Sequence, residues 1–249
     1  MSTWIQQAVA RGRLTTRFPW APPNEEEAPI TAHAPEVPPP ATRTLPLAAP
    51  VCPTGAIESE GVRQGACIRC ARCLSHGLTP TGPVDLMASS IALLRSPSGL
   101  RHEPPSVRSP SPGFRRSLHV FLIDVGSCNA CNREALGLAN PYYDSQRLGI
   151  FFTNSPRHAD VLLVVGIPTR EMLPSLSRTY EAMPGPKAVV AIGACALEGG
   201  IFRGNPHAAL PLSDHVPVDA YVPGCPPPPL AILSALWRVM RGPPSREGP

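Results

Sequence analysis

The fold is decided by the stretch Leu118-His-Val-Phe-Leu-Ile-Asp-Val-Gly-Ser-Cys128-Asn-Ala-Cys131-Asn-Arg-Glu134. Its first six residues form an apolar run, which predicts a buried strand, and the residues after the first cysteine lead into a helical segment. Two later cysteines have the same context, since Cys195 follows the apolar run 188–192 and Cys225 follows the run 220–222. Each cysteine site is therefore expected just beyond the end of a strand.

Apolar runs and amphipathic segments alternate along the second half of the chain. They predict strands at 118–123, 148–152, 160–166, 187–192 and 218–222, and helices at 129–139, 171–183 and 228–241. This alternation indicates an α/β fold of three layers around a parallel sheet, and we expect a flavodoxin-like strand order. Gly193 and Gly224 are expected to let the backbone turn sharply before the last two cysteines.

Ligands of such a sheet bind at the carboxyl ends of its strands. Cys128, Cys131, Cys195 and Cys225 are therefore expected to converge there, although they lie far apart in the sequence. Four converging thiolates indicate a metal centre, and we favour a 4Fe-4S cluster over zinc.

The composition of the chain limits which partners and which domain organisation can be expected. The 249 residues carry a formal net charge of +4, which is too small to indicate a nucleic-acid partner. Proline accounts for 35 residues, about 14 % against a usual ~5 %. Much of it lies within 19–50 and 96–113, where we expect extended linkers or belts along a partner instead of regular structure. The predicted organisation is an N-terminal helix and linker (1–50), a small module (51–95), a second linker (96–115), the α/β domain (116–242) and a tail (243–249).

The chain shows no secretory signal and no apolar run long enough to cross a membrane, so we expect it in the cytoplasm. Its eight cysteines should then be thiols or metal ligands instead of disulfides. They fall into two groups of four, one on each side of the second linker, and none is left over.

The first group is Cys52-Pro-Thr-Gly-Ala-Ile followed by Cys67-Ile-Arg-Cys70-Ala-Arg-Cys73. Bacterial ferredoxins use C-x2-C-x2-C-x3-C-P runs in which the fourth cysteine ligates the other cluster. In that register the chain lacks cysteines at positions 42, 45, 48 and 77, which are the complete ligand set of one cluster. The remaining four are the complete set of the other. The pattern predicts a small ferredoxin-like module that keeps one 4Fe-4S cluster, with zinc as the alternative.

Three motifs carry a family resemblance: Gly126-Ser-Cys128-Asn-Ala-Cys131, Gly193-Ala-Cys195 and Pro223-Gly-Cys225-Pro-Pro. They resemble the family of proximal-cluster small subunits shared by nickel-iron hydrogenases and complex I. The complex I member carries two adjacent cysteines at the first site, whereas this chain has the C-x2-C of the hydrogenases. Pro141-Tyr-Tyr-Asp144 and Pro156-Arg-His-Ala-Asp160 resemble segments of the small subunit of membrane-bound hydrogenases of formate hydrogenlyase type.

The N-terminal part is similar to the ferredoxin subunit of the same enzymes. The chain therefore looks like a fusion of the small subunit and the ferredoxin subunit.

The resemblance implies that Cys128, Cys131, Cys195 and Cys225 hold the cluster proximal to a partner's active site. Glu134 matches an acidic position near that cluster and is a candidate proton or interface residue. Its alternative role is that of an exposed acid favoured by the dipole of a helix. We assign no chemistry to Tyr142, Tyr143, Arg147, His158 or Asp160.

The chain has no nucleotide-binding fingerprint and no nucleophile with a matched base, so catalysis by the polypeptide alone is not expected. The predicted function is an electron relay through two 4Fe-4S clusters. The implied partners are a catalytic large subunit (nickel-iron, or its counterpart in complex I), membrane-arm subunits, and an electron donor or acceptor protein or a quinone. The expected place is the cytoplasmic side of the inner membrane, peripheral and held by partners. The alternatives are a complex I-type NADH/quinone oxidoreductase, a nickel-free hydrogenase-related complex, and a zinc-stabilised scaffold.

Overall fold

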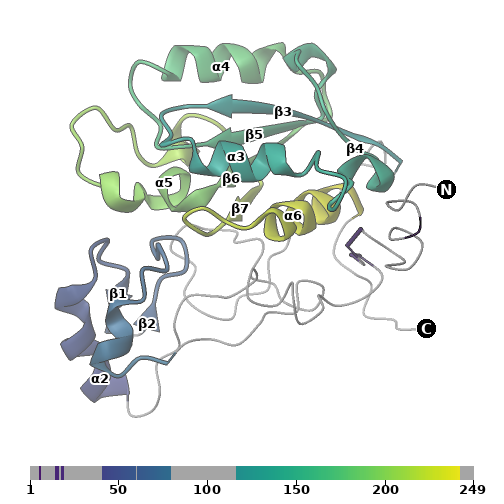
Figure 1. Ribbon diagram of the computed structural model, residues 1–249. Helices are drawn as coiled ribbons and strands as arrows, with labels where there is room; N and C mark the ends of the chain where they lie inside the picture. The colour runs from purple at the N-terminus through teal and green to yellow at the C-terminus, as the bar shows by residue number, and fades with distance from the viewer. Residues whose placement is uncertain are drawn as a thin grey trace.

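The computed structural model describes residues 41–59, 61–79 and 116–241, together with Gln6, Thr15, Thr16, Phe18 and Pro19. These residues form a small N-terminal unit (41–79) and a larger C-terminal unit (116–241), which lie against each other in Figure 1. The predicted helix at 1–14, apart from Gln6, the second linker up to residue 115 and the tail at 243–249 lie outside the described residues. Nothing in the described part forms a helix long and apolar enough to cross a bilayer.

The C-terminal unit is built on a five-stranded sheet whose neighbouring strands are all parallel. The strand order is β4-β3-β5-β6-β7, in which the first strand of the unit lies second from the edge, as in flavodoxin. This order confirms the predicted fold class. The strands, in spatial order, are β4 (Ile150–Phe152), β3 (Leu118–Asp124), β5 (Val161–Val165), β6 (Ala188–Ile192) and β7 (Ala220–Val222).

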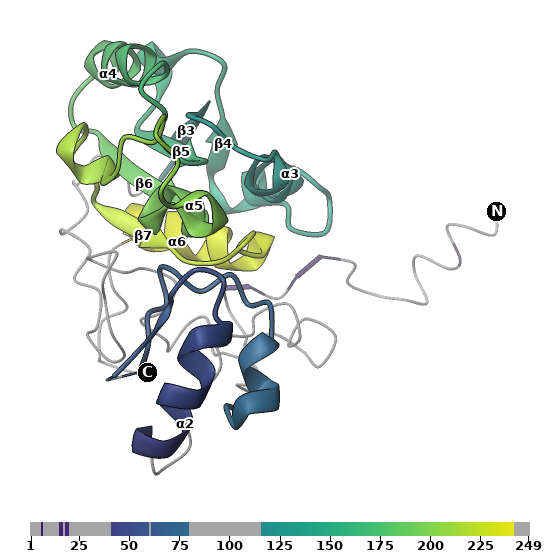
Figure 2. The same ribbon diagram turned by 90° about the vertical axis from the view of Figure 1, so that its left-hand side faces the viewer.

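The sheet is buried on both faces, which explains why its central strands are continuously apolar. In β5, Val161, Leu163 and Val165 belong to one hydrophobic core, while Leu162 and Val164 belong to the other. The first core is covered by helices α3 (Ala130–Gly137) and α6 (Pro229–Arg241), and the second by α4 (Leu173–Ala182) and α5 (Gly193–Glu198). Figure 2 shows the resulting three layers.

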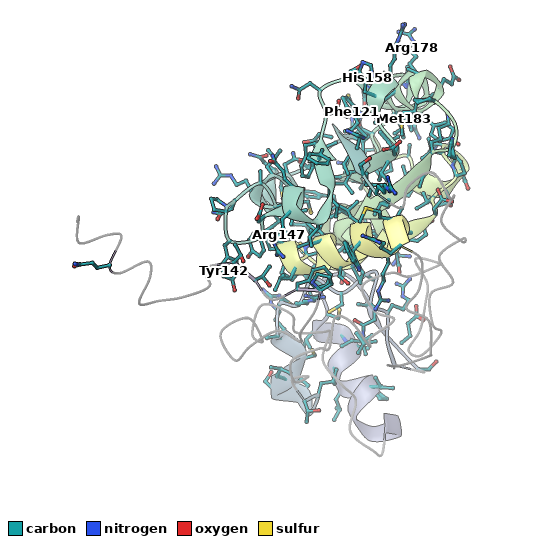
Figure 3. The ribbon with its side chains drawn as sticks, turned by 90° about the vertical axis from the view of Figure 1, so that its right-hand side faces the viewer. Phe121, Tyr142, Arg147, His158, Arg178 and Met183 are labelled. Atoms are coloured by element: carbon teal, nitrogen blue, oxygen red, sulfur yellow. The ribbon has the colours of Figure 1, made fainter. Side chains whose placement is uncertain are left out.

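Thr16 and Phe18 pack against the C-terminal unit, beside α6. Phe18 is buried, and its ring meets that of Trp237 edge to face at a centroid distance of 6.4 Å. The amide of Thr16 donates to the carbonyl of Tyr142 (2.8 Å), and Arg147 Nη2 donates to the carbonyl of Thr16 (3.4 Å). Figure 3 places Tyr142 and Arg147 together on the α6 side. Both residues therefore hold this chain's own N-terminal stretch.

The N-terminal unit contains α2 (Ala41–Ala48), the 3-10 turns Ala49–Val51 and Arg72–His76, and a two-stranded antiparallel sheet of β1 (Ile57–Glu58) and β2 (Gly61–Val62). The composition predicted no regular structure within 19–50, and this is wrong for α2. The helix forms because Leu45 and Ala48 are buried in the small core of this unit, while Pro46 is exposed near the helix end. A proline inside a helix removes one hydrogen bond and crowds the preceding turn, so the burial of Leu45 and Ala48 has to outweigh that cost.

Candidate metal centres

The four C-terminal cysteines lie at one edge of the large sheet. Cys128 follows β3, Cys131 lies in the first turn of α3, Cys195 lies in α5 directly after β6, and Cys225 follows β7. Burial raises the pKa of Cys131 to about 12, and the neighbouring thiols of Cys195, Cys225 and Cys128 contribute to the rise. Burial, together with the thiols of Cys225 and Cys128, raises the pKa of Cys195 to about 11. The fold thus brings together the four residues that the sequence predicted to converge.

Two glycines allow the close approach of these loops. Gly193 has φ +88°, and a Cβ there would lie 2.6 Å from Cys131 Sγ. Gly224 has φ +147°, and its Cβ would meet the Cα of Pro227 at 2.5 Å. The amide of Ala194 donates to the carbonyl of Gly224 (2.7 Å), so the loops of the last two cysteines are joined directly. The sharp turns predicted at both glycines are present, and a side chain at Gly193 would occupy the space of a thiol.

Asp124 shapes the loop that carries Cys128. Its Oδ1 accepts the amides of Gly126 (2.9 Å) and Ser127 (2.8 Å), and its Oδ2 accepts the Ser127 hydroxyl and the Asn132 side-chain amide, both at 2.6 Å. Burial raises the pKa of this carboxyl, but the four hydrogen bonds outweigh burial and leave the pKa below its usual value. The loop is therefore held by an ionised carboxylate.

Glu134 lies one helical turn beyond Cys131 on α3 and is half-buried. It is close enough that its charge contributes to the raised pKa of the Cys131 thiol. The acidic residue thus lies beside the thiol group, as the resemblance implies. Its role as a proton or interface residue stays a prediction.

The N-terminal cysteines surround one pocket. Cys52, Cys67, Cys70 and Cys73 all line a hollow with about 340 Å³ of empty space, open solvent included. Burial raises the pKa of Cys67 to about 11, and the thiols of Cys52 and Cys73 contribute to the rise. The second group of four predicted from the sequence therefore also lies together.

Backbone amides point at two of these sulfurs. The amide of Ala56 donates to Cys52 Sγ (3.2 Å), and the amide of Arg69 donates to Cys67 Sγ (3.4 Å). Arg69 and Ala71 have φ values of +56° and +61°, which non-glycine residues rarely adopt. Strained backbone of this kind is concentrated at functional sites.

Two positions that lack a ligand in the ferredoxin pattern are filled by the core. Leu45 and Ala48 are 2 % and 0 % exposed and pack with Ile57, Val62 and Leu78. Gly77, at another such position, has φ +92° and ends the turn that carries Cys73. At positions 45 and 48, apolar packing therefore stands where the ferredoxin pattern has ligands of another cluster.

The two units meet through two arginines of the N-terminal unit. Arg63 forms an ion pair with Glu198 at the end of α5, and Glu58 lies 2.9 Å from its Nε. Arg69 Nη2 donates to the carbonyl of Pro223, in the loop that leads to Cys225, at 3.5 Å. Figures 1 and 2 both show the N-terminal loops beneath α5 and the connection from β7 to α6. The two cysteine groups therefore lie on either side of one internal contact.

The donor chemistry fits iron–sulfur groups. Thiolate is their usual protein ligand, and buried thiols that raise one another's pKa values need a cationic group before all can ionise. Among the described residues, no three histidine, cysteine or acidic side chains lie close enough together to coordinate a single metal ion. The fit therefore depends on the grouping of four thiols, the thiol pocket and the glycine that makes room for Cys131.

Other candidate residues lie away from these groups. His158 and Asp160 precede β5, at the sheet edge opposite the cysteines. Asp160 accepts the amide of His119 at 2.7 Å and so has a structural role at the start of the sheet. Figure 3 shows His158 near Arg178 and Met183 on the α4 side.

Sequence reasoning missed Asp124, Asn132, Arg63 and Arg69. A signal existed for Asp124, because an aspartate two residues before a Gly-Ser pair at the end of a strand is typical of a side chain that caps a turn. No local signal indicated the arginines, because their partners lie more than a hundred residues away in the sequence.

The fold and the site together define an α/β protein that gathers cysteines at the carboxyl ends of its strands. Residues 128–239 match the family described as NADH ubiquinone oxidoreductase, 20 Kd subunit. A probable membrane-bound hydrogenase subunit of Pyrococcus furiosus is 48% identical over 118 residues, which are 47% of this chain and 71% of the relative. Formate hydrogenlyase subunit 7 of Escherichia coli is 42% identical over 120 residues, 48% of this chain and 47% of the relative.

A solved archaeal structure, the membrane-bound sulfane sulfur reductase, matches with 34% identity and a TM-score of 0.46, covering 51% of this chain and 71% of the matched one. The chain belongs to the family of the complex I 20 kDa subunit and the related small subunits of membrane-bound hydrogenases. This confirms the resemblance drawn from the cysteine motifs.

Proposed function

We propose that this chain is the electron-transfer subunit of a complex I-related oxidoreductase, and that the complex is a membrane-bound nickel-iron hydrogenase of formate hydrogenlyase type. The observation that carries the proposal is the convergence of Cys128, Cys131, Cys195 and Cys225 at one sheet edge, in a chain of which 118 residues are 48% identical to a probable membrane-bound hydrogenase subunit. The Cys128-x2-Cys131 spacing supports the hydrogenase, because the complex I subunit resembles this chain but carries two adjacent cysteines there.

Each group of four thiolates would hold one 4Fe-4S cluster, which supplies one-electron transfer when bound. The residues of the chain hold and surround these groups. Asp124 holds the Cys128 loop, Gly193 leaves room for Cys131, and the amides of Ala56 and Arg69 donate to cysteine sulfurs. Hydrogen bonds to sulfur and burial are the means by which a protein adjusts such potentials.

In this proposal residues 51–95 are the ferredoxin-like module and 116–242 the proximal-cluster domain. A catalytic large subunit would cover the cysteine edge of the sheet. Ile201 and Phe202 support this arrangement, because they are 56% and 37% exposed directly after Gly200, which lies against Cys195. Membrane-arm subunits would hold the assembly at the cytoplasmic face of the membrane, and a donor protein would meet the N-terminal unit.

A second candidate is a subunit of a complex I-type quinone reductase. The observation that favours it is the family match itself, which is described as a subunit of NADH ubiquinone oxidoreductase. Nickel analysis of the purified complex separates the two candidates. Nickel in the partner supports the hydrogenase, and a nickel-free complex that reduces a quinone supports the second candidate.

The experiment that tests the relay is an iron and acid-labile sulfide assay of anaerobically purified protein, followed by paramagnetic resonance after reduction. About eight irons per chain and two reduced signals are expected for two cubanes. Cys195→Ser and Cys70→Ser should each remove a different signal and leave the other. Zinc in place of iron would instead identify a scaffold, and retained electron transfer in either variant would contradict the relay.

A further inference from the structure

Arg69 lies between the two cysteine groups and contacts a cysteine-bearing loop of each. Its backbone amide donates to Cys67 Sγ at 3.4 Å, while its guanidinium donates to the carbonyl of Pro223 at 3.5 Å, two residues before Cys225. The residue is half-buried, and its left-handed backbone belongs to the loop that winds between Cys67 and Cys70. One residue thus joins the loops of a ligand from each group, through its backbone amide on one side and its guanidinium on the other.

The charge of Arg69 acts on both thiols. It lowers the pKa of Cys67 and that of Cys225, although burial keeps both pKa values above their usual range. Burial in turn lowers the pKa of the guanidinium, while the same two thiols raise it. An arginine nonetheless stays protonated at neutral pH. A fixed positive charge therefore lies in the contact between the groups.

The comparison with Arg63 shows what is unusual about Arg69. Arg63 crosses the same contact, but Glu198 and Glu58 both pair with it, so its charge is neutralised locally. Within the described ranges, Arg69 forms no ion pair with a carboxylate. Among these residues no carboxylate neutralises its charge, which lies beside the sulfurs of both groups.

We propose that Arg69 is a positioning residue that couples the two cysteine groups, fixing their approach through Pro223 and stabilising an added electron at either group. The inference rests on the proposed function. A transfer between the groups moves one electron from one to the other, with no proton and no bond made or broken. Because Arg69 contacts both loops, it favours the reduced form of each, so loss of its charge should lower both potentials together.

The test is a redox titration of the assembled complex, followed by paramagnetic resonance, for Arg69→Gln beside the wild type. At a fixed potential near the midpoints, the reduced-to-oxidised ratio of both signals should fall about tenfold, which is ~59 mV for a one-electron couple. Arg72→Gln is the charge-matched control, because Arg72 is exposed at the start of the 3-10 turn that carries Cys73, and its loss removes the same charge. The control should change both ratios by less than about threefold.

Arg69→Lys separates charge from folding. If the glutamine variant loses iron, the lysine variant, which keeps the charge, should keep both potentials near those of the wild type. Unshifted potentials in Arg69→Gln, a shift in one signal alone, or an equal shift in Arg69→Lys and Arg69→Gln would each overturn the proposal. A wild-type protein with four irons or with zinc would instead contradict the proposed function, whatever the arginine variants show.

Discussion

The two cysteine groups are built in opposite ways. Cys52, Cys67, Cys70 and Cys73 come from one short stretch and line one pocket, so local loop geometry gathers them. The four C-terminal cysteines come from three loops, and only the parallel sheet brings them to one edge. The first group depends on spacing along the chain, whereas the second depends on the order of the strands.

The supporting cores differ as much as the cysteine groups. The N-terminal unit has a single small core around Leu45, Ile57 and Val62, against which three of its cysteines pack. The C-terminal unit buries both faces of its sheet under helices. Small units with little apolar surface to bury usually need a metal to fold. We therefore expect the N-terminal unit to depend on its bound group and the C-terminal unit to be stable without one.

The largest expected effect is that of removing iron by chelation. Amide hydrogens of residues 41–79 should exchange with almost no protection, because the small core alone does not offset the entropy of the chain. Those of β5 and β6 should stay protected by the two-sided core. Hydrogen exchange followed by mass spectrometry measures both. Equal loss of protection in the two units would contradict the comparison.

A smaller effect is expected from Leu45→Ala in α2. The side chain is 2 % exposed, and its loss should cost about 2–5 kcal/mol, enough to open the N-terminal unit and release its iron. Leu47→Ala on the same helix is the control. Leu47 is 65 % exposed, so its replacement should stay within about 0.5 kcal/mol. The iron content and the free energy of urea unfolding are measured for both variants. Equal losses of stability and iron in Leu45→Ala and Leu47→Ala would show that α2 does not depend on Leu45.

Gly193→Ala tests the other group. The left-handed backbone should cost about 1–2 kcal/mol, and the new Cβ at 2.6 Å from Cys131 Sγ should displace the thiol. Gly204→Ala is matched, because Gly204 has φ +90° but no atom within 4 Å of its Cβ. Both variants should lose stability on thermal unfolding, and only Gly193→Ala should lose the C-terminal paramagnetic signal. Loss of that signal in both would assign the effect to backbone strain alone.

Asp124→Asn should have the smallest effect, about 1 kcal/mol at neutral pH, because asparagine keeps one acceptor for the loop amides. The native pKa of Asp124 is lowered, so the ionised carboxylate contributes stability above the unfolded value near ~3.9. That contribution is lost as the pH falls through the native pKa.

The difference between the wild type and Asp124→Asn should therefore shrink in acid, as urea unfolding of the iron-free protein from pH 7 downward would show. Asp214→Asn, at an exposed position, should show little difference at any pH. A difference that grows in acid would contradict the assigned charge.

Most of the C-terminal fold could be predicted from the sequence. Apolar runs identify buried strands because a strand covered on both faces is apolar at every position, as β5 and β6 are. The cysteines at the strand ends and the glycines before them predicted the site, because parallel strands end at one edge. The spacing of the first four cysteines likewise predicted their pocket.

Only the tertiary structure decided the formation of α2 and the contacts between the two units. The helix α2 forms in a proline-rich stretch because Leu45 and Ala48 are buried against residues further along the chain. Arg69 reaches Pro223, and Arg63 reaches Glu198, only because the two units lie against each other. Spacing and periodicity are local and are written in the sequence, whereas a contact between surfaces depends on how complete units pack, which no local pattern records.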